Sequence, residues 1–111
     1  MVTHRTLGEL EEAQDDQRRQ ARLRIELAEE YLLDYRSCIR EVQERFHEVA
    51  LREGVGDDPA FRYELRRTSA IVDEHVVQAG RRVTDLEDKY DQLLRSQADE
   101  REFFLAQPAG D

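Results

Sequence analysis

The sequence predicts an all-α protein, an antiparallel two-helix coiled-coil hairpin, from three observations. A single break, Gly54-Val55-Gly56-Asp57-Asp58-Pro59, divides the 111 residues into two stretches of nearly equal length. Glu, Arg, Gln, Ala and Leu, which favour helices, dominate both stretches. Apolar residues recur in both at alternating steps of three and four, the pattern of a left-handed coiled coil. We expect one domain over residues 1–111.

The first helix is expected over residues 7–53. Thr6-Leu7-Gly8-Glu9 fits a capping box, in which the Thr6 hydroxyl accepts from the Glu9 amide and the Glu9 carboxylate reaches back to the cap amide. No proline follows until the break. The helix should therefore run without interruption to Glu53.

The second helix is expected over residues 59–105, after a turn at residues 54–58. Gly54 suits the residue that ends a helix, and Asp58 suits the N-cap of the next one. Pro59 then falls at the first helical position, where the missing amide costs nothing. The helix should stop before Pro108, which leaves residues 106–111 as a short tail.

A tight turn would align the two apolar seams. If the chain doubles back near Val55, residues whose numbers sum to 111 come level, so that Ile39 faces Val72 and Phe46 faces Leu65. Both seams then match with the shortest available turn. The seam residues are Ile25, Ala28, Leu32, Tyr35, Ile39, Val42, Phe46 and Val49 in the first helix, and Val72, Val76, Ala79, Val83, Leu86, Tyr90 and Leu93 in the second.

The same register predicts a weaker seam toward the termini. It places Gln14 opposite Gln97, and Glu11 opposite Glu100, where like charges repel. We therefore expect a well-packed half beside the turn and a loose or partner-held half at the termini.

Apolar residues outside the seam predict a larger assembly. Leu23, Leu27 and Tyr31 follow one another at steps of four and form a second stripe. Two copies, or this hairpin and a different one, would bury it in a four-helix or larger bundle, and the alternative is scattered surface hydrophobes. Phe103, Phe104 and Leu105 cannot all point into one seam, so they predict either a docking tip or closure onto Leu7 and Leu10. The expected partner-binding residues are Leu23, Leu27, Tyr31, Leu33, Ile71, Val77, Leu94, Phe103, Phe104 and Leu105.

Composition and spacing argue against several classes of function. A net charge of -9 disfavours nucleic-acid binding, which depends on neutralising phosphates. His4, His47 and His75 have no metal-ligand spacing, no phosphate loop or nucleophile elbow occurs, and we expect no cofactor and no enzymatic activity. Cys38 beside the seam is expected to be a partly buried packing residue.

The location in the cell is predicted from what the N-terminus lacks. It contains no apolar run of the length that a signal peptide or a membrane span needs. We therefore expect a leaderless cytoplasmic protein without membrane insertion, and export through a specialised system stays open.

Three segments carry a resemblance to a known family: residues 31–46, Phe61-Arg62-Tyr63-Glu64-Leu65 after the turn, and residues 86–94. With the helix–turn–helix plan, the chain resembles the small accessory targeting proteins of Gram-positive type VII secretion, which are encoded beside LXG toxins. The resemblance implies a partner, the helical N-terminal domain of such a toxin, together with a second small hairpin protein. The turn lacks Trp-x-Gly and the tail lacks the family's export signal, which implies a chaperone-type member.

Two functions are consistent with these features. The first is a non-enzymatic helical adaptor or chaperone that covers an apolar helical segment of a partner protein. The second is a structural coiled-coil stalk or spacer in a larger assembly. They differ in whether the second stripe binds a partner or belongs to a self-sufficient oligomer.

Overall fold

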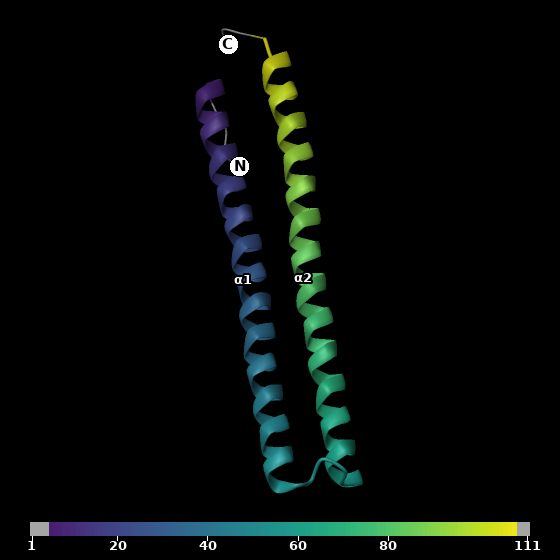
Figure 1. The fold of residues 1–111 in the computed structure, drawn as a ribbon. Helices are drawn as coiled ribbons and strands as arrows, with labels where there is room; N and C mark the ends of the chain where they lie inside the picture. The colour runs from purple at the N-terminus through teal and green to yellow at the C-terminus, as the bar shows by residue number, and fades with distance from the viewer. Residues whose placement is uncertain (1–4, 109–111) are drawn as a thin grey trace. The chain divides into compact units, whose positions relative to one another are not determined.

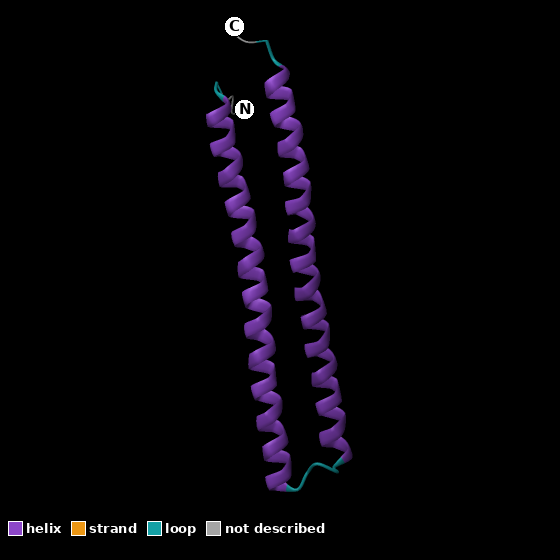
Figure 2. Ribbon diagram, turned by 45° about the horizontal axis from the view of Figure 1, so that its top comes forward, coloured by secondary structure: helices purple, strands orange, loops and turns teal. Residues whose placement is uncertain are grey.

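The structure, a computed structural model, describes residues 5–108 and is an all-α helical hairpin (Figure 1). Helix α1 spans Leu7–Glu53, and helix α2 spans Pro59–Ala106. One short loop joins the two helices, and the described residues form no strand (Figure 2). Helix α2 ends one residue later than expected, so the tail begins at Gln107, and residues 109–111 and His4 lie outside the described residues.

The start of α1 follows the capping signal. The Glu9 amide donates to Thr6 Oγ1 at 3.1 Å, which satisfies one of the amides that a helix leaves without a partner at its first turn. The Glu9 carboxylate reaches back one residue further than the capping box requires, since its Oε2 accepts from the Arg5 amide at 2.9 Å. The first bond of the predicted capping box is therefore formed, whereas the Glu9 carboxylate bonds the Arg5 amide in place of the predicted Thr6 amide.

The loop ends one helix and begins the next within residues 54–58. Gly54 adopts a positive φ of 67°, and the Val55 amide donates to the Ala50 carbonyl at 3.2 Å, which is the Schellman arrangement at a helix C-terminus. On the other side, Asp58 Oδ1 accepts from the Ala60 amide at 2.8 Å and caps α2. Arg62 Nε donates to the Gly56 carbonyl at 3.0 Å and ties the loop to the first turn of α2.

By packing, the chain divides into two units. The turn unit comprises Ala28–Val83, and the terminal unit comprises Met1–Leu27 with Thr84–Asp111. In each unit a segment of α1 packs against a segment of α2.

The predicted register is found in each unit. In the terminal unit Gln14 and Gln97, whose numbers sum to 111, exchange two hydrogen bonds. In the turn unit Ile39 and Val72 line one cavity together with Phe46 and Leu65. The helix segments are therefore paired as the matched seams predict.

The side-chain exposures do not follow the expected weakening of packing toward the termini, and the relative stability of the two halves stays a prediction. In the terminal unit Leu10 is 1% exposed, and Gln14 and Gln97 are each 5% exposed. In the turn unit the seam residues Val42 and Phe46 are 40% and 47% exposed. Paired amides close the seam around Gln14 and Gln97, although a cavity beside Ala21 and Tyr90 lies in the same unit. In the turn unit Ala50 and Val83 are buried, whereas Val42 and Phe46 remain open to solvent.

The positive φ at Gly54 predicts a specific sensitivity. An L side chain is strained in this conformation, so Gly54→Ala should lower the free energy of unfolding by about 1 kcal/mol in urea denaturation. Gly56→Ala is the matched control, because an added Cβ meets no atom within 4 Å at either glycine and only Gly54 has a positive φ. An equal loss in both variants would contradict the assignment of the strain to Gly54.

Candidate functional site

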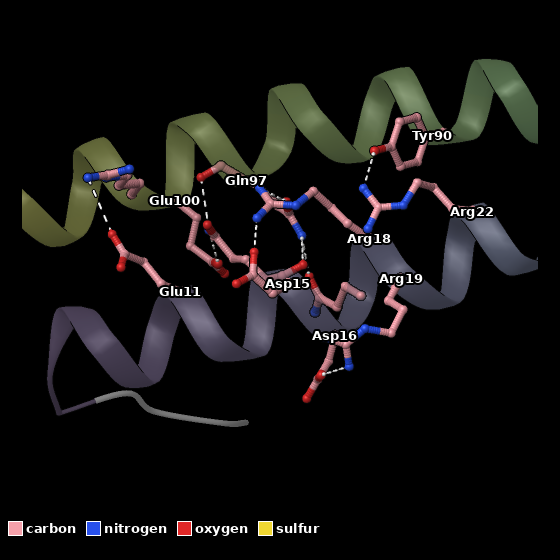
Figure 3. Close-up of polar contacts among 12 residues, drawn as sticks. Glu11, Asp15, Asp16, Arg18, Arg19, Arg22, Tyr90, Gln97 and Glu100 are labelled. Atoms are coloured by element: carbon pink, nitrogen blue, oxygen red, sulfur yellow. Dashed lines mark hydrogen bonds and ion pairs between the residues drawn. The ribbon is translucent and has the colours of Figure 1, made fainter.

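A polar layer crosses the seam of the terminal unit. Gln14 Nε2 donates to the backbone carbonyl of Gln97 at 3.0 Å, and Gln97 Nε2 donates to the backbone carbonyl of Gln14 at 3.0 Å. The two amide groups have further partners, because Glu100 Oε1 accepts from Gln14 at 2.9 Å and Gln17 Oε1 accepts from Gln97 at 2.9 Å (Figure 3). Both side chains are buried, and no buried polar side-chain atom in the described residues lacks a partner.

Glu11 and Glu100, the acidic residues expected to face each other in this seam, each contact a donor on the other helix. Glu11 forms an ion pair with Arg101 at 3.3 Å, and Glu100 accepts from Gln14. Each carboxylate thus has a donor of its own, which removes the repulsion that was expected between Glu11 and Glu100.

Basic residues of α1 are engaged on the surface of the terminal unit. Arg18 pairs with Asp15, and Arg19 pairs with Asp16 at 3.0 Å (Figure 3). Arg22 also donates to the Tyr90 hydroxyl at 3.4 Å. Exposed pairs of this kind add little stability, but they occupy the guanidinium groups that phosphate binding would need.

An open apolar groove lies between the helix segments of the turn unit. It consists of two adjoining cavities of about 280 Å³ and about 550 Å³, which share Phe46, Phe61 and Leu65 in their walls. Ile39, Val42 and Val72 extend the first cavity, and Ala50 and Leu51 extend the second. The walls are largely apolar, and Val42, Phe46, Leu51 and Leu65 in them are exposed to solvent.

Three stacked rings lie on the turn unit. The Tyr31 and Tyr35 rings have centroids 6.2 Å apart, and the Tyr35 and His75 rings have centroids 6.3 Å apart, both nearly parallel. The Tyr31 ring stacks on Tyr35, and the Tyr31 residue is 64% exposed to solvent. Cys38 is exposed, and its expected partial burial is wrong.

The predicted partner-binding residues are open to solvent, with one exception. Phe104 is half-buried, while its neighbours Phe103 and Leu105 are exposed. The nine exposed residues divide between the units: Leu23, Leu27, Leu94, Phe103 and Leu105 in the terminal unit, and Tyr31, Leu33, Ile71 and Val77 in the turn unit.

The sequence did not predict that several apolar residues in or near the seam of the turn unit would be exposed to solvent. The 3-4 spacing assigned Val42, Phe46 and Val49 to a buried seam, and Leu65 to the position facing Phe46. All four exceed a third exposure, as do Leu51 and Tyr63, which the spacing leaves outside the seam. The groove depends on the distance between the two helix segments, which spacing along one helix does not report.

The described residues contain neither a metal-ligand cluster nor a membrane-spanning helix. No group of three or more His, Cys, Asp or Glu side chains could hold an ion there. Neither helix has, within the described range, the length of apolar sequence that crossing a bilayer requires.

Comparison with known proteins gave no match, either to family models or to curated proteins or solved structures.

The polar layer predicts a strong dependence between two residues. Gln14→Ala should lower the free energy of unfolding by about 1 kcal/mol, because it removes the hydrogen bonds that the Gln14 side-chain amide donates to the Gln97 backbone carbonyl and to Glu100 Oε1. Replacing both residues by leucine should recover most of the loss, since no buried polar group is then unpaired.

Chemical denaturation of the single and double variants measures this coupling, with the exposed Gln20→Ala as control. Losses that simply add, with no recovery in the double leucine variant, would mean that the two amides do not depend on each other.

Proposed function

We propose that the protein is a non-enzymatic helical adaptor that binds a helical segment of a partner protein. The observation that carries the proposal is the extent of exposed apolar surface. Among residues 5–108, fifteen large apolar side chains are 38–72% exposed. Exposed apolar residues in this number, both in the seam and outside it, are typical of surfaces that another protein covers.

The form of the surface supports a helical partner. Exposed leucines at a spacing of four, such as Leu23 and Leu27, lie on one side of a helix and suit packing against a second helix. Recognition between amphipathic helices uses anchors at this spacing. The polar layer holds the helix pair of the terminal unit in one register, so its surface is formed before a partner arrives.

The resemblance to type VII secretion accessory proteins gives the proposal a specific form. The partner would then be the helical N-terminal domain of an LXG-type toxin, bound together with a second small hairpin protein, and the chain would act in the cytoplasm as a targeting factor or chaperone.

We expect the chain to form a stable complex with the product of a neighbouring gene when the two are co-expressed. Leu23→Asp combined with Leu27→Asp should weaken the complex by about tenfold or more, because a charge in a desolvated helix contact is costly. Isothermal titration or co-purification measures the loss, and circular dichroism checks that helicity is kept.

Ala98→Asp is the control for added charge, since this residue is exposed in the same unit and is not among the predicted contacts. Equal weakening by the control would contradict the assigned surface. A chain that ignores every neighbouring product and assembles only with itself would instead favour the structural spacer.

A further inference from the structure

A cavity of about 360 Å³ lies between the helix segments of the terminal unit. Its apolar walls come from Ala21 of α1 and from Leu86 and Leu93 of α2, and all three residues are half-buried. Arg24 of α1 and Lys89 of α2 also line the cavity, and both residues are exposed. The cavity therefore combines apolar walls with two cationic groups that reach solvent.

The walls of this cavity differ in charge from the unit around them. The terminal unit contains 14 acidic and 8 basic residues, a net charge of −6. Within the described part of the chain, the only charged residues that line the cavity are Arg24 and Lys89. Two cations on one cavity repel each other, and an anion between them would be attracted to both. An anionic group is thus the ligand that these walls favour.

Neither cation is neutralised by a carboxylate of this chain. Among residues 5–108, Arg24 and Lys89 form no ion pair, whereas Arg18 and Arg19 each pair with an aspartate three residues before them. For Arg24 the helix offers no acidic neighbour, because the residues three and four positions away on either side are glutamine, alanine and leucine. Lys89 has Asp85 four positions before it, but the two side chains do not form an ion pair.

The cavity adjoins the surface to which the partner helix is proposed to bind. Leu27, one of the exposed leucines of that surface, lies three residues after Arg24 and therefore on the same side of α1. A helix that packs on Leu27 would bring a side chain one turn away close to Arg24. A glutamate at that position has methylene groups for the apolar walls and a carboxylate for the cations.

We propose that the cavity binds the carboxylate of a glutamate side chain from the partner helix, between Arg24 and Lys89. The inference rests on the proposed function and adds the chemistry that the partner must carry. A guanidinium group donates two parallel hydrogen bonds to a carboxylate, and an ammonium group adds a second positive charge. Elsewhere the negative charge of the unit favours basic residues on the partner, so this one glutamate fixes where the partner helix lies.

Hexanoate, a carboxylate on an apolar stem, probes the cavity in the full chain without the partner. We expect it to shift the NMR signals of Leu86 and Leu93 saturably, with a dissociation constant of about 1–30 mM. Hexan-1-ol, which has the same stem and no charge, should bind more weakly. Arg24→Gln and Lys89→Gln should each weaken hexanoate binding by about threefold or more, because each removes one charged contact.

Arg95→Gln is the matched control, since Arg95 is an exposed cation of the same unit that does not line the cavity. It should leave hexanoate binding unchanged. Circular dichroism checks that the variants keep their helicity, which we expect because glutamine favours helices. Hexanoate that binds no better than hexan-1-ol, or equal weakening by the Arg95 control, would overturn the carboxylate site.

The complex with the co-expressed neighbouring gene product decides the source of the carboxylate. Arg24→Gln combined with Lys89→Gln should weaken this complex by about tenfold, and Arg95→Gln should not. A complex that the double variant leaves intact, while hexanoate still binds the wild-type chain, would overturn the assignment to a partner side chain in favour of a free carboxylate. If no complex forms, the proposed adaptor function fails, whereas the hexanoate titration still decides whether the cavity binds a carboxylate.

Discussion

The register between the two helices is the constraint on which the rest of the structure depends. It begins at the loop, where the positive φ of Gly54 and the bond from the Val55 amide to the Ala50 carbonyl end α1. The Asp58 cap starts α2 only a few residues later. So short a connection allows few alignments of the neighbouring helix segments, and the alignment that occurs brings Ile39 and Val72 to one cavity.

The two units use this pairing in different ways. In the terminal unit the seam contains amides, and Gln14 and Gln97 satisfy one another and hold one register, because any slip would leave buried polar groups unpaired. In the turn unit the seam contains apolar side chains, of which Val83 is buried and Val42 and Phe46 are exposed. Directional hydrogen bonds specify a single arrangement of a helix pair, whereas apolar contact alone does not.

This contrast bears on function. The hydrogen bonds between Gln14 and Gln97 fix the register of the terminal unit, and a preformed register would reduce the entropy lost on binding the proposed partner. The turn unit has an exposed apolar groove, which only a further polypeptide segment could cover. The terminal unit also carries more of the negative charge than the turn unit, with net charges of −6 and −3.

The sequence by itself determined the all-α class, the helix bounds to within one residue and the pairing of Gln14 with Gln97. These features follow from local rules, since caps, glycine and proline positions and the 3-4 spacing act within a few residues. The exposure of most off-seam residues, such as Leu33 and Phe103, was predictable in the same way. The tertiary structure alone decided at which residues the seam is closed and at which it is exposed to solvent. That outcome depends on the distance between two helix segments and on the partners available to each buried polar group, and neither quantity is encoded in the spacing of one helix.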